Sequence, residues 1–324
     1  MNVEREVLCF MEVVSLIGGL GSQMFKYAFY LALKEKCLGE CLIDTSFFLQ
    51  RKSWNGYELN RLFGIEAPDL KNRLTREQIN SITEKKSSYI DECLKYLSKK
   101  GKVSYYFMGT RYTYSSFPLS TYRKLRQKVL FFLHMCGKHY QYTLEQVIAD
   151  DNAYFDEYFH NSDEHFRFCK DIVKNAFLFP EFDDEKNKLV SQKMKNEDSV
   201  AIHIRRTDHL ADNGKLFNNE YYKKSVNYIK KVNIDKLVFY IFSDDLNWCR
   251  LHLSDIGINK SDEVEFVGWN KEESSYKDMQ LMTYCKHNIL AISSFSWWGY
   301  YLSERDNKIV CAPVGYWTEV KNHF

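Results

Sequence analysis

Apolar and polar positions in the first fifty residues follow two rhythms. A compact β-type run, Val13–Ile17, ends in the turn Gly18-Gly-Leu-Gly21, and apolar residues then recur every three or four positions from Gln23 to Leu33. A second short apolar run covers Glu40–Asp44. A strand, a glycine turn, a helix and another strand in this order predict a parallel β-α-β unit.

The second half of the chain alternates more regularly. Its pattern predicts strands at 199–204, 236–242, 264–267, 288–292 and 309–311, and helices at 221–231, 248–253, 276–285 and 295–302. This alternation is typical of a doubly wound parallel sheet with helices on both faces.

The region between these halves is less regular. From about 74 to 140 the chain is rich in lysine, with helix-like stretches at 75–81 and 91–99 and little strand signal, which we interpret as a helical insertion. An amphipathic helix is expected at 166–177, before Pro180. We therefore predict an α/β protein with two Rossmann-like lobes, at 1–160 and 161–324.

Composition narrows the functional class. The chain has 324 residues, enough for two cores, and its 45 Lys and Arg against 43 Asp and Glu give a net charge of +2. So balanced a charge argues against nucleic acid as the main partner. Nine cysteines without a C-x-x-C pair predict reduced thiols in a cytoplasmic protein. Cys37 and Cys41 are interpreted as buried small hydrophobes rather than metal ligands.

Neither a signal peptide nor a membrane span is predicted, because the start lacks a basic segment before a sustained apolar run and no apolar stretch reaches the ~18–20 residues required. One segment leaves two alternatives open. The apolar run 129–136 has basic flanks, so it could lie peripherally on the anionic face of the inner membrane or form a core helix with solvated ends.

Two adjacent arginines stand at the end of the predicted strand 199–204. An arginine stays charged near neutral pH and holds phosphate oxygens bidentately, so Arg205 and Arg206 could clamp a diphosphate. Alternatively, they form a structural salt-bridge network with Asp208. His203, on the same strand, is a candidate nucleotide contact.

Hydroxyl and carboxylate side chains end two further strands of the predicted sheet. Ser293 and Ser294 begin a helix-like segment, where serines cap helices but can also bind phosphate together with free amides. Ser243 and Asp244 close another strand, and one of the acids Asp244 and Asp245 is expected to cap the helix that follows. The acids do not form a D-x-D triplet, so we predict no metal requirement.

Five segments occur in an order that resembles the bacterial α-1,2-fucosyltransferases of glycosyltransferase family 11. The resemblance is dense from about 199 to 317 and poor between 74 and 140. It departs at Ser22 and Ile292, where the family usually has asparagine. The segments are Gly18-Gly-Leu-Gly-Ser-Gln-Met-Phe-Lys-Tyr-Ala28, His203-Ile-Arg-Arg-Thr-Asp208, Phe242-Ser-Asp-Asp245, Tyr276-Lys-Asp-Met-Gln-Leu-Met282 and Ser293-Ser-Phe-Ser-Trp-Trp298.

This resemblance implies a GT-B-like fold whose two lobes face a central cleft, with GDP-fucose held mainly by the second lobe. It implies inverting transfer of L-fucose from GDP-β-L-fucose to the 2-hydroxyl of a galactoside in glycan, O-antigen or capsule synthesis, without a cofactor. Arg205 or Arg206 would stabilise the departing diphosphate. Donor contacts would come from Gly19, Leu20, Gly21, Ser22, Gln23, His203, Ser243, Asp244, Ser293, Ser294, Phe295 and Ser296.

The group that accepts the proton of the acceptor hydroxyl is left open. Asp208 follows the arginines, and its spacing equally suits a partner that orients them; His209, Asp156 and Glu157 are alternatives. Two other classes of function remain: a nucleotide-sugar-binding protein without turnover, and an oxidoreductase on a dinucleotide fold, although the turn is not G-x-G-x-x-G. The sequence does not indicate the acceptor or the oligomeric state.

Overall fold

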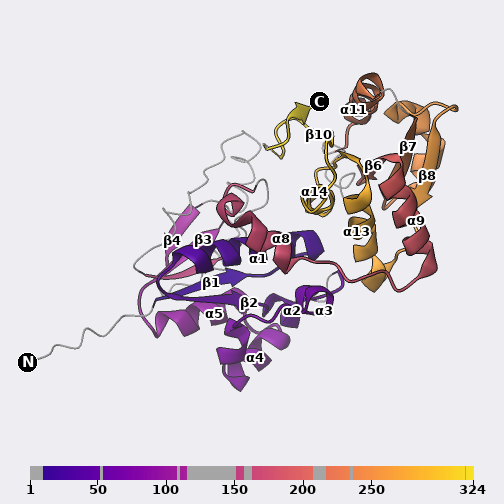
Figure 1. Cartoon of the computed structure of the whole chain (residues 1–324). Coiled ribbons are helices and arrows are strands. Elements are labelled where there is room, and N and C mark those ends of the chain that lie inside the picture. The colour runs from indigo at the N-terminus through magenta and orange to yellow at the C-terminus, as the bar shows by residue number, and fades with distance from the viewer. Residues whose placement is uncertain are drawn as a thin grey trace, which may run out of the picture. The chain divides into compact units, whose positions relative to one another are not determined.

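The chain forms two compact α/β units, Met1–Ala176 and Phe177–Phe324, each built on its own sheet (Figure 1). The computed structural model describes residues 10–51, 54–107, 110–114, 151–156, 163–206, 217–233, 236–317 and 319–324. Both predicted Rossmann-like lobes are therefore confirmed. The division falls after Ala176, later than the predicted boundary at 160, so the helix before it belongs to the first unit.

The sheet of the first unit has the strand order β2-β1-β5-β3-β4. Its strands are parallel except β4, which is antiparallel to β3. The strands are β1 Met11–Ser15, β2 Glu40–Asp44, β3 Val103–Phe107, β4 Thr110–Thr113 and β5 Asn152–Phe155. Its helices are α1 Leu20–Lys36, α2 Phe47–Gln50, α3 Leu59–Phe63, α4 Arg76–Thr83, α5 Tyr89–Ser98 and α8 Lys170–Ala176, with 3-10 turns at Leu70–Arg73 and Arg167–Cys169.

Both faces of this sheet are covered. On one face, Val13 and Tyr154 pack with the apolar sides of α4 and α5. Because side chains alternate along a strand, the next residue points to the other face, and there Phe155 meets Phe29 of α1 with ring centroids 5.2 Å apart. The glycine turn thus leads from β1 into a helix that packs back onto β1 and β2.

The prediction of a helical insertion at 74–140 is wrong for the part of this range that the structure describes. The helices α4 and α5 are present, but β3 lies between β5 and β4 inside the sheet, so this region helps to build the lobe. All five side chains of β3 are buried, and a strand buried on both faces shows no alternation of apolar and polar positions. The segment at 129–136 lies outside the described residues.

The sheet of the second unit has the order β11-β10-β9-β6-β7-β8, and all its strands are parallel. The strands are β6 Asp198–Ile204, β7 Leu237–Ser243, β8 Glu263–Val267, β9 His287–Ile289, β10 Val310–Ala312 and β11 Asn322–His323. The helices are α9 Glu185–Asn196, α11 Asn219–Val232, α12 Leu246–Leu251, α13 Tyr276–Tyr284 and α14 Ser294–Tyr301, with 3-10 turns at Leu253–Ile256 and Glu272–Ser274.

Two cores sandwich this second sheet. Val200, Ile202 and Ile204 of β6 face the core that includes α11 and α12. Ala201, between them, faces the core that includes α9 and α13. Every strand and helix predicted from the alternation is present, while α9, whose apolar positions are few, was not predicted. None of the helices within the described ranges could span a membrane.

The order of this sheet reverses beside β6. From β6 the chain adds β7 and β8 on one side, then crosses to β9 and continues outward through β10 and β11. In open parallel sheets, ligands bind in the crevice at the carboxyl ends of the two strands that flank such a reversal. Here those strands are β6, which is followed by Arg205, and β9. After β9 comes the serine-rich bend at 293–296.

Candidate functional site

Arg205 and Arg206 lie directly after β6, at the carboxyl edge of the second sheet. Their carboxylate partners come from the end of the neighbouring strand β7: Arg205 Nε lies 3.5 Å from Asp244 Oδ2, and Arg206 Nε lies 3.2 Å from Asp245 Oδ2. The expected salt bridges therefore exist, with partners other than Asp208. Asp208, like His209, lies outside the described residues.

Arg206 is firmly held. Its guanidinium lies 4.0 Å from the ring centre of Trp248 and 5.2 Å from that of Phe217, and its backbone N–H donates to Asp244 Oδ1 at 2.9 Å. Only 14% of its side chain is exposed. Stacking of a cation on two aromatic rings fixes the plane of the guanidinium, so this arginine has little freedom to reorient.

Arg205 is in a different situation. Its side chain is 34% exposed, and its distance of 3.5 Å to Asp244 is too long for a strong charge-assisted hydrogen bond. Arg206 stacks on Trp248 of α12, whereas Arg205 faces the carboxylate of Asp244 at the end of β7. The two guanidinium groups therefore differ in exposure and in direction.

His203 connects the end of β6 to the serine-rich bend. Its ring lies 5.8 Å from that of Phe295, the second residue of α14, and its backbone oxygen accepts a hydrogen bond from Tyr222 at 3.0 Å. His203 as a whole is 7% exposed. His203, Phe295 and the first turn of α14 are thus neighbours at the switch point.

The serines of this bend have separate roles. Ser293 caps α14 by accepting a hydrogen bond from the N–H of Phe295, and Ser296 is buried, donating to Ser293 O and accepting from Ala291 N–H. Capping and internal bonding therefore account for these two hydroxyls. Ser294 is partly exposed at the first turn of α14, where helix N–H groups and the helix dipole favour an anion. The following Trp297 and Trp298 are fully buried.

The two carboxylates after β7, Asp244 and Asp245, have different partners. Asp245 is the N-cap of α12, since its Oδ1 accepts from the N–H of Trp248 at 3.1 Å, which confirms that one of the two acids caps a helix. Ser243 accepts from the N–H of Asp245 at 3.0 Å. Asp244, bonded to the backbone of Arg206, has a carboxylate that also faces Arg205.

In the first unit, the glycine turn follows β1, and Gly18 has φ = +84°, which favours glycine. Gln23 is fully buried and braces this turn: its amide nitrogen donates to the oxygens of Gly18 and Gly56, and its side-chain oxygen accepts from the N–H of Glu58. The geometry gives Gln23 a structural role. Gly19, Leu20, Gly21 and Ser22 form the turn and the start of α1.

Asp156, an alternative for the base, directly follows β5. Its carboxylate accepts from the hydroxyl of Tyr105 at 2.9 Å, and its backbone oxygen accepts from Lys26 Nζ, which is buried, at 2.8 Å. These bonds tie the end of β5 to β3 and to α1. Glu157 lies outside the described residues.

Asp278 is a residue to which sequence reasoning gave no role, although it stands in a quoted motif. It lies in the first turn of α13, and burial raises the pKa of its carboxyl to about 7 while a hydrogen bond from Asn270, at 2.7 Å, opposes the shift. A carboxylate with such a pKa is unusual and is a candidate for function. Its signal in the sequence is an acid in a helix with the apolar residues Met279, Leu281 and Met282 just after it.

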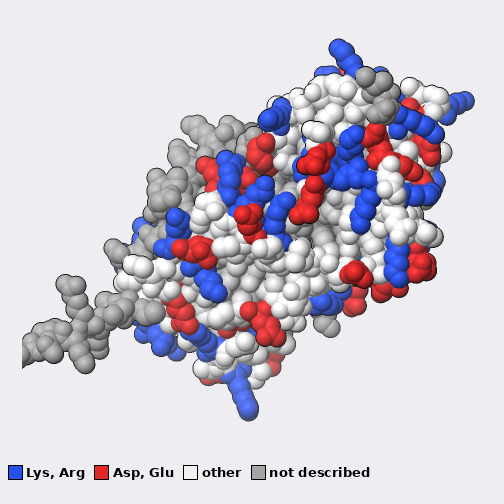
Figure 2. Space-filling view, in the orientation of Figure 1, with Lys and Arg blue, Asp and Glu red and all other residues white. Residues whose placement is uncertain are grey.

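Charge is mixed over the surface. Figure 2 shows basic and acidic side chains interspersed over one face of the molecule. Among the described residues, one group has the composition of a metal site: Glu12, Cys37 and Cys41. The expectation that both cysteines are buried is wrong, since each is partly exposed. The group belongs to the first unit, and the arginines belong to the second.

A family model and several known proteins match this chain. The model described as Glycosyl transferase family 11 matches residues 98–320. An alpha-1,2-colitosyltransferase of Escherichia coli is 38% identical over 133 residues, 39% of this chain and 44% of that protein. The O-antigen biosynthesis glycosyltransferase WbnK of Escherichia coli is 25% identical over 92% of both chains.

A shorter match links the chain to a vertebrate protein. Galactoside alpha-(1,2)-fucosyltransferase 1 of Saimiri boliviensis boliviensis is 32% identical over 112 residues, 33% of this chain and 29% of that protein. Apart from WbnK, the chain thus spans less than half the length of these relatives. Among solved structures, NodZ alpha-1,6-fucosyltransferase soaked with GDP-fucose is 12% identical, with a TM-score of 0.46 and coverage of 91% of this chain and 92% of that chain.

Proposed function

Since this chain belongs to glycosyl transferase family 11, we propose that it transfers L-fucose from GDP-β-L-fucose to the 2-hydroxyl of a galactoside, with inversion at the anomeric carbon. The observation that carries the proposal is the pair of arginines at the switch point of the second sheet. Ligands bind at such points, and a diphosphate is the ligand for which exposed guanidinium groups and a helix N-terminus are suited.

The two arginines take different roles in this proposal. Arg205, the more exposed of the two, would leave the carboxylate of Asp244 and contact the diphosphate of the donor. Arg206, stacked on Trp248 and paired with Asp245, acts as a positioning residue that fixes the chain after β6. In the absence of donor, Asp244 offers the negative charge that the diphosphate would supply.

The chemistry follows from charge. As the bond from the fucosyl carbon to the diphosphate breaks, positive charge grows on the sugar ring and negative charge on the leaving oxygen. A fixed cation beside that oxygen stabilises the transition state more than the ground state, so Arg205 lowers the barrier without requiring a metal ion. The acceptor hydroxyl attacks the fucosyl carbon from the opposite side, GDP leaves with the bonding electrons, and the hydroxyl proton passes to solvent or to a base, for which His209, Asp156 and Glu157 stay candidates. Asp208 remains a candidate for orienting the arginines.

The rest of the donor is assigned by position. We propose that His203 and Phe295, whose rings are neighbours, contact the nucleotide or the sugar, and that Asp244 accepts hydrogen bonds from the ribose or the guanine. Ser243, Ser293 and Ser296 support the backbone around them. The donor contacts expected from Gly19, Leu20, Gly21 and Ser22 of the first unit stay a prediction, and Gln23 braces their turn.

A second donor has a specific observation in its favour. The relative that is 38% identical is named as an alpha-1,2-colitosyltransferase, and colitose is fucose without its 3-hydroxyl. One hydroxyl alters the polar contacts of the sugar pocket and leaves the diphosphate chemistry unchanged. GDP-colitose is therefore the alternative donor, and the O-antigen role named for WbnK makes a lipid-linked glycan a candidate acceptor.

The test is a transfer assay with two donors. The purified protein is incubated with lactose and either GDP-fucose or GDP-colitose, and the products are identified by mass spectrometry and by NMR of the new linkage. We expect an α-1,2-linked product on galactose from GDP-fucose. Product from GDP-colitose alone would transfer the proposal to the second donor.

The same assay separates the rival classes of function. GDP-fucose that binds but yields neither transfer product nor free fucose across an array of galactosides would favour a nucleotide-sugar-binding protein. A thermal shift with nicotinamide cofactors, and none with GDP-fucose, would favour an oxidoreductase.

A further inference from the structure

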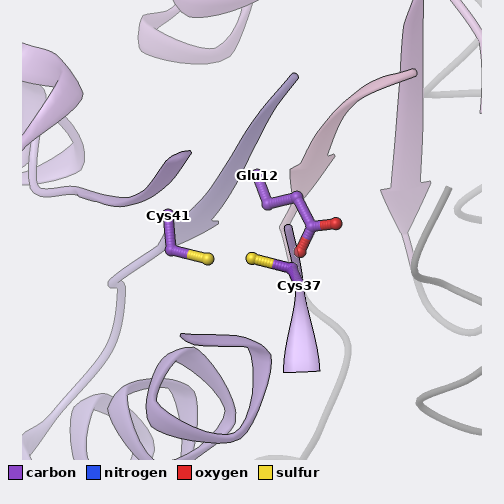
Figure 3. A group of neighbouring side chains, drawn as sticks. All are labelled: Glu12, Cys37 and Cys41. Atoms are coloured by element: carbon purple, nitrogen blue, oxygen red, sulfur yellow. The ribbon is translucent and has the colours of Figure 1, made fainter. Parts of the chain in front are cut away.

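A group of three side chains at the amino end of the first sheet plays no part in the proposed transfer. Glu12 is the second residue of β1, Cys41 is the second residue of β2, and the two are direct partners in the parallel register. Cys37 is the C-cap of α1, which packs on both strands. Figure 3 shows the two sulfur atoms pointing towards each other, with the carboxylate beside Cys37.

The ligand atoms of this group are already close together. One carboxylate oxygen and the two Sγ atoms all lie within 4.8 Å of one another. Two thiolates on a tetrahedral zinc ion, each at about 2.3 Å, lie roughly 3.8 Å apart, so small side-chain rotations are enough to close the site. The donors come from a strand, a helix end and a second strand, all held by the packing of the sheet.

The glutamate gives an independent indication of a ligand. Glu12 is 3% exposed, and its Oε2 has no hydrogen-bond partner among the described residues. A buried carboxylate oxygen without a partner costs free energy, and a bound cation would remove that cost. Both cysteines are partly exposed, which leaves a route from solvent.

We propose that Glu12, Cys37 and Cys41 bind one zinc ion through a carboxylate oxygen and two thiolates. Sulfur donors favour zinc over Mg²⁺ or Ca²⁺, which prefer oxygen ligands throughout. Both thiols release their protons to solvent when the ion binds, and no electron is transferred. Three protein ligands leave the fourth position of the tetrahedron to water or another donor.

This zinc ion would be structural. It would join the ends of β1, α1 and β2, and it would bind the folded unit in preference to the unfolded chain, so it should raise the unfolding temperature. Gly18 follows Glu12 by six positions along mostly extended chain, roughly 20 Å. The ion therefore lies too far from the glycine turn to touch a donor bound there.

The experiment uses the full-length protein, reduced and stripped of metal, and titrates it with Co²⁺ and then with Zn²⁺. We expect one ion per chain, a thiolate-to-cobalt charge-transfer band that zinc abolishes, and an unfolding temperature that rises with zinc by several degrees. Cys37→Ser and Cys41→Ser should each remove the band, and Glu12→Gln should weaken binding about tenfold or more.

Cys169→Ser is the matched control. Cys169 is a buried thiol of the same unit that donates to the oxygen of Phe166, a bond that serine can keep, so this variant should retain the band. Reduced protein without a cobalt band would overturn the proposal whatever the stability of the variants. A cobalt charge-transfer band that persists in both Cys37→Ser and Cys41→Ser would also overturn the proposal. A Cys37–Cys41 disulfide in purified protein, with no zinc binding after reduction, would identify a redox pair instead.

Discussion

Replacing Arg205 with alanine should slow sugar transfer by roughly 10²–10³ and leave the protein folded. The kinetic cost follows from losing a charged donor at the leaving diphosphate, worth about 3–4 kcal/mol by analogy with oxyanion donors. The cost in stability should be small. The side chain is 34% exposed and lies 3.5 Å from Asp244, and exposed ion pairs of this kind contribute about 0–1 kcal/mol to the free energy of unfolding.

Arg206→Ala should behave differently. It removes the ion pair with Asp245, which caps α12, and the stacking on Trp248, together worth about 1–3 kcal/mol of unfolding free energy. We expect transfer to be lost in this variant too, but with an unfolding temperature lower by several degrees. Loss of transfer without loss of stability indicates contact with the donor, as proposed for Arg205. Loss of both indicates a positioning role, as proposed for Arg206.

The assay measures initial rates with saturating donor and acceptor, GDP affinity by calorimetry, and unfolding temperature for each variant. Arg250→Ala is the matched control, because Arg250 stacks on Phe266 at 4.0 Å, like Arg206 on Trp248, without pairing to Asp244 or Asp245. It should keep turnover within about twofold. Turnover of Arg205→Ala within a few-fold of the unaltered protein would refute the role given to Arg205.

Three further predictions concern the brace, the buried acid and metal dependence. Gln23→Ala should lower the free energy of unfolding by about 2–4 kcal/mol, because it leaves the oxygens of Gly18 and Gly56 and the N–H of Glu58 without their hydrogen bonds. Chemical denaturation measures this loss. A loss below about 0.5 kcal/mol would contradict the bracing role. The pKa of Asp278, raised by burial to about 7, lies above its unfolded value near 3.9, so the folded state binds more protons between about pH 4 and 7 and its stability falls as pH rises through that window. Asp278→Asn should remove this pH dependence. The free energy of unfolding of the variant, relative to that of the unaltered protein, should therefore grow by up to about 4 kcal/mol from pH 4 to pH 8. A difference that does not change with pH would argue against the raised pKa. Transfer should proceed at the same rate with and without added Mg²⁺ or Mn²⁺; a rise of tenfold or more on addition would show that a divalent ion, rather than Arg205, neutralises the diphosphate.

Periodicity predicted the second unit well because its elements are regular. The strands β6 and β7 are apolar runs, and from β6 to β10 strands alternate with helices; β11, which follows β10 without a helix between them, was not predicted. The first unit was harder. Its strand β3 is buried on both faces between lysine-rich helices, so neither alternation nor composition marked it, and only its run of β-branched and aromatic residues could have done so.

The site was predictable in its positions more than in its contacts. The carboxyl ends of strands gather Arg205, Asp244 and Ser293 once the sheet is parallel, and the sequence placed them there. It could not show that Arg206 stacks on Trp248, nor that Gln23 serves the backbone, because both depend on packing between segments distant in the chain. For the same reason, the pairing of Glu12 with Cys41 appears only when β1 and β2 are in register.

The central claim, that the carboxyl ends of β6 and β9 bind the diphosphate of the donor, is tested most directly by a crystal structure of the protein with GDP. We predict that the guanidinium of Arg205 turns from Asp244 to the diphosphate, whose oxygens also meet the first turn of α14 at Ser294. A nucleotide bound elsewhere, with Arg205 still paired to Asp244, would contradict the account.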